Sequence, residues 1–355
     1  MTTKNASYFD KYRHATAIKI MFIVICVILT VIAFLFTLKI GFYKLSFSEV
    51  WDVIINHLKG NISNPQADYI IWERRVPEAI LAVFCGASLA AGGAVMQTVL
   101  RNPLTDSYTT GISSGAFLGA ALSIILGISI IPGIGSWAIV SNAFIFSLIP
   151  VAVIVLVSRK KNVTASKLIL TGVAVMYLFS AITTLLMVSA HPEQLSEAYS
   201  WRIGTLANAT WESIPIVVPV TLLGLTFLIT QSRKYNVVST GDNLALSLGV
   251  DSKKTTIISL VVIAFMTAAV VSFTGTIGFI GLVGPHIARI FVGSDCRFLI
   301  PASAAVGGLF LVCMDSVAKV SGTLGLPVGV VSALIGAPIF IAILIKNKRT
   351  AWDRS

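Results

Sequence analysis

A serine motif in this chain matches the pattern around a catalytic nucleophile. Gly111, Ser113 and Gly115 fit Gly-x-Ser-x-Gly, with His286 as a candidate base for acyl hydrolysis. That chemistry needs a sharp turn between a strand and a helix, whereas this serine opens an apolar, helix-like stretch. Gly111, Gly115 and Gly119 also recur every four residues, as small residues do where membrane helices approach closely. We therefore interpret the motif as a stripe of close helix contacts and expect no catalytic residue.

Ionisable side chains within the apolar stretches are few. Asp315 and Lys319 lie four residues apart, a spacing that allows an ion pair along one helical face. A carrier driven by protons or sodium usually holds a carboxylate near the middle of a span, and no stretch has one there. The sequence also lacks the Gly-x-x-x-x-Gly-Lys-Ser/Thr loop that cradles nucleotide phosphates. We expect neither ion coupling nor nucleotide hydrolysis by this chain alone.

Four evenly spaced glycines and a proline interrupt the chain between Gly275 and Arg289. The segment reads Gly-Thr-Ile-Gly-Phe-Ile-Gly-Leu-Val-Gly-Pro-His-Ile-Ala-Arg and follows a long apolar run without charges. Such a break at membrane depth is tolerated only where protein or a water-filled cavity satisfies the freed backbone groups. The segment therefore indicates a transport path.

The elements that position these residues are membrane spans. The chain has 355 residues, of which 56% are hydrophobic and 12% charged, far from the composition of a soluble domain. A span needs roughly 20 apolar residues. The sequence predicts about ten spans, near residues 20–38, 76–100, 110–130, 134–157, 167–190, 213–231, 255–275, 280–292, 298–318 and 327–346. The eighth is too short to cross alone. We expect an all-α polytopic membrane protein with one transmembrane domain over residues 1–355.

The basic residues set the expected orientation of the spans. The net charge of +11 could suggest nucleic acid, but most of the 26 lysines and arginines fall in alternate connections. This is the bias that keeps positive loops in the cytoplasm. It predicts a cytoplasmic segment over residues 1–19, a ten-helix bundle over 20–346, a cytoplasmic tail over 347–355, and no nucleic-acid partner. The first span lacks a small-residue cleavage site after it and is expected to be retained.

With ten spans, spans two to five and seven to ten run in opposite directions, which predicts an inverted repeat. Between spans six and seven, residues 243–250 predict a brief amphipathic helix ended by Gly249. This helix is either a docking element on the cytoplasmic face or an interfacial helix that only covers the bundle. The four cysteines have no paired spacing, so the sequence supports neither a disulfide framework nor a zinc site.

Several ordered blocks from about residue 70 to 346 closely resemble the FecCD permease family. The blocks are Arg75-Val76-Pro77, the glycine-rich second span through Gln97, Asn102-Pro103-Leu104, Gly111 with Gly115, Gly278 to Arg289, Leu326 to Val331, and Gly336-Ala337-Pro338. This family supplies membrane subunits of ABC importers for ferric siderophores, haem and cobalamin. The resemblance implies a type II ABC importer permease fold in a prokaryotic cell membrane, with both termini in the cytoplasm.

The resemblance also implies the partners. Two cytoplasmic ATPase subunits would hold ATP and Mg, so this chain needs no cofactor of its own and no metal. An extracytoplasmic substrate-binding protein would dock outside, and a second copy or a paralogous permease would complete a dimer in the lipid. The implied mechanism is alternating access.

The resemblance further implies roles for individual residues, with no catalytic residue among them. Glu78 stands where a second docking arginine is common, Lys319 where a third occurs, and Ala165 where a relative has a hydroxyl residue. The implied sites are the path and gates at Gln97, Asn102, Leu104 and Ser166; ATPase contact at Leu244, Ala245, Leu246, Ser247, Leu248 and Gly249; binding-protein docking at Arg75, Lys319 and Arg74; and structural roles for Gly278, Gly281, Gly284, Pro285, His286 and Arg289.

Several alternatives stay open at this point. A ferric siderophore is the expected cargo, with haem or cobalamin as alternatives within the family. An ion-coupled secondary transporter and a hydrolase using Ser113 or Ser114 are the competing classes. The sequence does not decide the chelate, the identity of the ATPase and binding protein, homodimer against heterodimer, or whether Glu78 and Lys319 alter docking.

Overall fold

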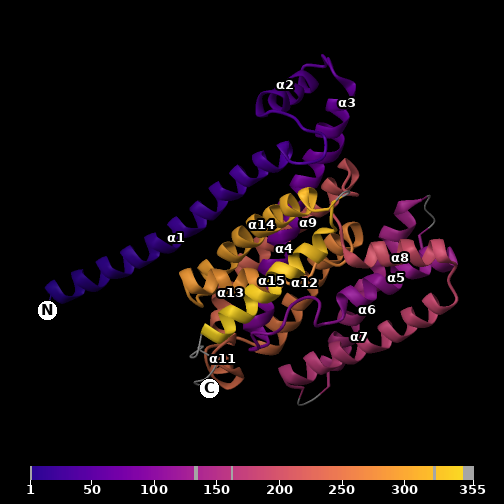
Figure 1. Ribbon diagram of the computed structural model, residues 1–355. Helices are drawn as coiled ribbons and strands as arrows, with labels where there is room; N and C mark the ends of the chain where they lie inside the picture. The colour runs from indigo at the N-terminus through magenta and orange to yellow at the C-terminus, as the bar shows by residue number, and fades with distance from the viewer. Residues whose placement is uncertain (1, 132–134, 161–162, 323–324, 347–355) are drawn as a thin grey trace.

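The computed structural model describes residues 2–131, 135–160, 163–322 and 325–346 (Figure 1), and this part of the chain contains helices and no strand. The expected tail over 347–355 lies outside these residues. The elements in chain order are α1 (Thr2–Lys39), α2 (Phe47–Leu58), α3 (Pro65–Asp68), the π-helix η1 (Tyr69–Arg75), α4 (Val76–Val99), α5 (Ile112–Leu126), α6 (Ser136–Ser158), α7 (Ala165–Val188), α8 (Pro192–Ile203), the 3₁₀ turn η2 (Trp211–Ser213), α9 (Ile214–Thr230), α10 (Ser232–Val238), α11 (Asp242–Ser247), α12 (Ser252–Thr274), α13 (Ile280–Val292), α14 (Cys296–Val320) and α15 (Val328–Lys346).

The ten predicted spans correspond to eight long helices and two short ones. Among the described residues, eight helices are long and apolar enough to cross a membrane, while α5 and α13 fall short. The short eighth span was predicted, but the third span is shorter than the predicted 110–130. Gly127 ends α5 in a left-handed conformation with φ of 65°. The 15 residues of α5 extend about 22 Å, less than the hydrocarbon thickness of about 30 Å.

Helix α4 lies at the centre of the bundle because its small residues let neighbours approach. Its apolar window is 83% buried, more than that of the other long helices described. Gly86 on α4 faces Gly307 on α14 so closely that a side-chain carbon on either would meet the backbone of the other. Gly93, two turns further on, lies in the same way against the carbonyl of Gly281 on α13. These small residues therefore fix α4 against both α13 and α14.

The contacts of the two four-span sets correspond to one another. The contact of α5 with α6 has its counterpart in α13 with α14, α5 with α7 in α13 with α15, and α6 with α7 in α14 with α15. The two sets also interlock reciprocally, since α4 contacts α14 and α12 contacts α6. Both short helices begin after a left-handed residue, Gly111 before α5 and Phe279 before α13. This pattern is what an inverted repeat requires.

The connection between α1 and α4 carries short helices. Figure 1 shows α1 along one edge of the bundle, with α2 and α3 beyond its C-terminal end. Ser46 and Glu49 form a reciprocal capping box that starts α2. His57 on α2 contacts Asp68 on α3 at 2.8 Å and stacks on Trp72 in η1. These contacts hold α2 and α3 to the segment that leads into α4. They thereby order the connection between α1 and α4.

Candidate functional site

Two non-helical segments meet inside the bundle, one before each short helix. The segment between α4 and α5 carries Tyr108, whose hydroxyl accepts a hydrogen bond of 3.0 Å from the backbone N–H of Ile277. Ile277 belongs to the glycine-rich break between α12 and α13 and is fully buried. A tyrosine from one break therefore satisfies a backbone group freed in the other, which is how a membrane protein tolerates such breaks.

Asp106 is a buried carboxylate in the first of these segments, and the sequence reading missed it. Its side chain is 3% exposed, and its Oδ1 accepts hydrogen bonds from the N–H groups of Tyr108 at 3.1 Å and Thr109 at 3.0 Å. Asp106 lies between two spans in sequence, so a search for charges within apolar runs cannot find it. Its bonds to the backbone shape the turn that leads into α5.

Gln97 joins α4 to α13. Its Nε2 donates to the carbonyl of Gly281 at 3.3 Å, and its Oε1 accepts from Nη2 of Arg289 at 3.2 Å. Gln97 is fully buried, so it faces no open path in this conformation. These contacts hold α13 against α4, and the path role expected for Gln97 stays a prediction.

His286 occupies a structural position on α13. Its Nδ1 lies 2.8 Å from the carbonyl of Leu282, and its ring meets Phe340 edge-on at 5.0 Å. The side chain is 7% exposed.

The serine motif lies at a close contact between helices. Gly115, the last residue of the motif, and Gly119, four residues later, lie directly against the backbone of α6. The interpretation of that motif as a close-contact stripe is confirmed.

The expected cytoplasmic gate residues lie on two separate elements. Asn102 follows α4, and its Oδ1 accepts a hydrogen bond of 2.9 Å from the N–H of Leu104. This turn presents the Leu104 side chain, which is 52% exposed. Ser166 lies in the first turn of α7, is exposed, and follows the cap formed by Thr164. We name residues 101–104 the gate segment.

Helix α11 and the residue that caps it expose three leucines, which together we name the ridge. Leu244, Leu246 and Leu248 are 51%, 71% and 60% exposed, while Ala245 between them is fully buried. The helix begins at Asp242 and ends at Ser247, so it is shorter than the predicted 243–250, because Gly249 takes a left-handed conformation with φ of 77°. The ridge has the character of a docking surface.

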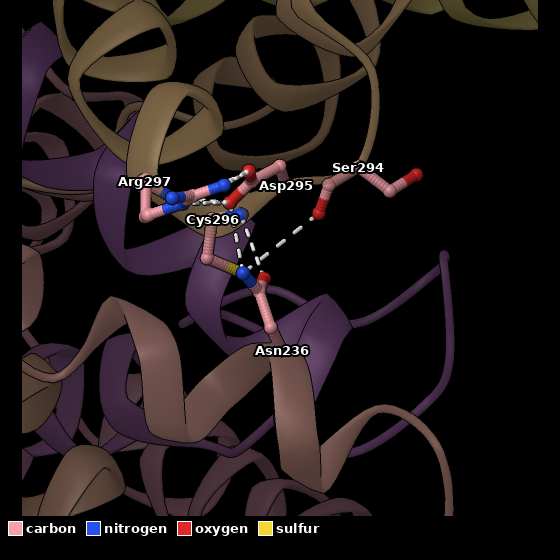
Figure 2. A network of polar contacts seen from close by, with 5 residues as sticks. All are labelled: Asn236, Ser294, Asp295, Cys296 and Arg297. Carbon is pink, nitrogen blue, oxygen red and sulfur yellow. Dashed lines mark hydrogen bonds and ion pairs between the residues drawn. The ribbon is translucent and has the colours of Figure 1, made fainter. Parts of the chain in front are cut away.

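A polar network fixes α10, the helix that precedes α11 (Figure 2). Asn236 on α10 donates to Asp295 Oδ1 at 2.8 Å and accepts from the N–H of Cys296 at 2.8 Å. Arg297 contacts both oxygens of Asp295. Burial raises the pKa of Asp295, but the hydrogen bonds from Arg297 and Asn236 outweigh it and hold the pKa at about 2. Asp295 thus stays charged and joins α10 to the start of α14.

Removal of this carboxylate should loosen the end of the bundle where α10 meets α14. Asp295 caps α14 by accepting from the N–H of Arg297, so Asp295→Ala removes a helix cap and the bond to Asn236 together. We expect a loss of about 1 to 2 kcal/mol in the free energy of unfolding. Denaturant titration in mixed micelles measures it. Asp52→Ala, at an exposed position on α2, is the matched control and should change little. Equal stability of both variants would contradict the network's role.

The outer end of the bundle holds a buried ion cluster. Lys319 Nζ lies 3.0 Å from Glu78 Oε2 and 2.7 Å from Asp315 Oδ2, which confirms the predicted pairing along α14. Glu78 on α4 is the partner that the sequence reading did not find. Thr37 on α1 donates to Asp315 at 3.4 Å and accepts from Lys319 at 3.4 Å. The cluster therefore joins α1, α4 and α14.

Arg75 also bonds within the chain. Its Nη1 donates to the carbonyls of Leu38 at 2.9 Å and Lys39 at 3.2 Å, and its Nη2 donates to that of Tyr43 at 2.8 Å. The residue is 5% exposed, whereas Arg74 beside it is exposed. All three expected docking residues line one outer hollow of about 530 Å³. Within it, Arg74 presents the most accessible positive charge of the three.

Comparisons with known proteins extend over most of the chain. The FecCD transport family matches residues 29–346. The cobalamin import system permease protein BtuC of Halobacterium salinarum is 40% identical over 279 residues, covering 78% of this chain and 74% of that protein. The hemin transport system permease protein HmuU of Yersinia pestis is 33% identical over 327 residues, covering 90% and 94%. A solved ABC transporter of metal-chelate type, in an inward-facing conformation, covers 91% of this chain and 98% of its own, with a TM-score of 0.80 and 28% identity.

Proposed function

Since this chain belongs to the FecCD transport family of ABC importer permeases, we propose that it carries a ferric siderophore across a prokaryotic cell membrane into the cytoplasm. ATP hydrolysis belongs to partner subunits. The observation that most directly supports a transport role is the meeting of two broken spans at Tyr108 and Ile277. These two non-helical segments at the core of the bundle would act as a hinge between the helix sets α4–α7 and α12–α15 during transport.

The proposed cycle is alternating access. Two ATPase subunits, holding ATP and Mg, would dock on the α11 ridge, and their closure would move the gate residues Asn102, Leu104 and Ser166. The substrate-binding protein would dock at the outer hollow, and a second permease copy or a paralogue would form the other wall of the path. Both termini would lie in the cytoplasm. The exposed Leu244, Leu246 and Leu248 support this placement of the ATPase.

Our proposal for the cargo is supported by relatives that are named for different metal-containing compounds. BtuC carries a cobalamin import name, HmuU a hemin transport name, and the solved neighbour is of metal-chelate type. A chelate is common to all three. Ferric siderophore is our first choice, and haem and cobalamin are the alternatives that the experiment must separate.

Reconstituted uptake tests the proposed function. The permease and its ATPase are reconstituted in vesicles, and the binding protein is supplied on the side opposite the ATPase. A hydroxamate siderophore loaded with radioactive iron, haemin or cobalamin is added on the binding-protein side in parallel assays. We expect ATP-dependent accumulation of the siderophore, and none when the ATPase is omitted. Accumulation of haemin or cobalamin instead would reassign the cargo. Accumulation driven by an ion gradient without the ATPase would support a secondary transporter and overturn the proposal.

Reversal of the charge at Arg74 tests the docking surface. Arg74→Glu places a negative charge in the outer hollow without touching the bonds of Arg75, so stability should be unchanged. We expect binding-protein affinity to fall by about tenfold, mainly through slower association at low salt. Surface plasmon resonance against the vesicle-embedded permease measures it. Arg233→Glu, on the exposed face of α10, is the control. Unaltered affinity of the Arg74 variant would move docking away from this hollow.

A further inference from the structure

An ion pair joins the gate segment to α11. Nη2 of Arg101, the first residue of the gate segment, lies 3.0 Å from Oδ1 of Asp242, the first residue of α11. Arg101 comes immediately before Asn102 in sequence, and Asp242 comes two residues before Leu244. The pair therefore connects the segment that carries Leu104 with the helix that carries the apolar ridge.

The backbone is shaped to bring these two side chains together. Arg101 has a φ of 50°, a left-handed conformation that is uncommon for a residue with a side chain. Gly241, directly before Asp242, has a φ of 112°, and a side-chain carbon there would lie 3.7 Å from Nη1 of Arg101. The conformation of Arg101 ends α4, because the N–H groups of Arg101 and Asn102 bond the carbonyls of Thr98 and Gln97 as in a helix C-cap.

Helix α11 lies between two glycines and follows an anchored helix. Asn236 anchors α10 to the start of α14, so the element before α11 is held by the bundle. Gly241 and Gly249 bound α11, and both have positive φ. Residues at the ends of an element that absorb changes in φ and ψ are the usual hinges of a moving segment. Turning about these two glycines would move α11 as a unit while α10 stays in place.

A small hollow separates α11 from both gate elements. It has a volume of about 230 Å³ and is lined by Val99 and Arg101 at the end of α4, Ala165 beside Ser166, and Asp242 and Leu246 on α11. Apolar contact is incomplete across this gap, and the Arg101–Asp242 pair crosses it. The pair is thus placed to pass a displacement of α11 to the gate segment.

We propose that the Arg101–Asp242 ion pair transmits the movement of α11 to the gate segment, so that both are positioning residues for transport. The inference rests on the proposed function, because it takes α11 as the ATPase contact and Leu104 as a gate. The two side chains are 29% and 62% exposed, so in the chain alone the pair adds little stability. An ATPase subunit seated on the ridge would exclude water around Asp242 and strengthen the attraction.

The experiment follows Leu104 in the purified permease–ATPase complex. The four native cysteines are replaced by alanine, Leu104→Cys is introduced, and its labelling by a membrane-impermeant maleimide is timed before and after trapping with ATP and vanadate. We expect trapping to change the labelling rate by about tenfold with Arg101 present, and by less than about twofold in R101E. The charge swap R101E/D242R should restore the response, which a merely structural role would not. R233E is the matched charge reversal and should respond normally.

A second measurement in the same complex reports the link itself. Spin labels at Leu104→Cys and Asn243→Cys, both exposed positions and neither of them on the ridge, should keep one narrow distance distribution on trapping, and R101E should broaden it. A normal nucleotide response of Leu104 in R101E would overturn the inference and leave the proposed function intact. No nucleotide response with Arg101 present would overturn the proposed function, and the inference with it.

Discussion

Gly93→Ala is expected to be among the most disruptive single methyl additions in this chain. The added carbon would overlap the carbonyl of Gly281, and backbone atoms have no rotamer by which to move aside. Helix α13 would have to separate from α4, which would also break the bond from Gln97 to Gly281. Overpacking of this kind costs about 3 kcal/mol or more where the neighbour cannot yield. We expect a marked loss of folded protein.

The measurement is the free energy of unfolding in mixed micelles, together with the yield of monodisperse protein. Gly278→Ala is the matched control, because a side-chain carbon there meets nothing within 4 Å and the residue has no positive φ. We expect the control to fold with near-normal stability. If both alanine variants unfold alike, close approach at Gly93 is not what holds α13 against α4.

Lys319→Met should destabilise the outer end of the bundle by about 3 to 5 kcal/mol, since it leaves buried carboxylates without their cation. Glu78 and Asp315 have side chains that are 12% and 3% exposed, so water screens them poorly. Thr37 would lose Lys319 as a partner as well, which weakens the attachment of α1. Thermal unfolding and limited proteolysis of α1 would report the effect.

The informative control neutralises the whole cluster. In the triple variant Lys319→Met, Glu78→Gln, Asp315→Asn the unpaired charges are gone, and we expect most of the lost stability to return. The affinity of the stable triple variant for the binding protein then distinguishes a role of Lys319 in stability from a role in docking. Normal binding-protein affinity in a stable triple variant would show that Lys319 serves the bundle and not the docking surface, whereas a selective loss of affinity would assign it to docking.

The spans were predictable because each is a long apolar run bounded by charges, glycine or proline. The third span is shorter than predicted for a physical reason. Gly127 adopts a left-handed conformation and ends α5. The residues that follow it, Ile-Ser-Ile-Ile at 128–131, are still mostly apolar, so hydropathy alone extends the predicted span past the point where the helix ends.

The polar sites were less predictable, and their distance in sequence is the reason. The pair of Asp315 and Lys319 follows from helical spacing, whereas Glu78 joins it only through the packing of α4 on α14. Arg75 was expected at a docking surface, yet its carbonyl partners lie at the end of α1 and in the connection that follows it. Resemblance to a family indicates which positions matter. It does not say whether a positive charge faces a partner or the chain itself.

The shortness of α5 and α13 has a consequence for biogenesis. The part of α1 between Tyr12 and Lys39 is strongly apolar and little buried, so it can enter the bilayer by itself and set the topology during synthesis. Helix α13 has 13 residues and cannot partition stably alone. Helix α13 can therefore insert stably only after α14 has been synthesised, when it can pack against both α14 and α4. Membrane integration of the second set is therefore expected to be cooperative and late, and a ribosome stalled before α14 would leave α13 outside the hydrocarbon.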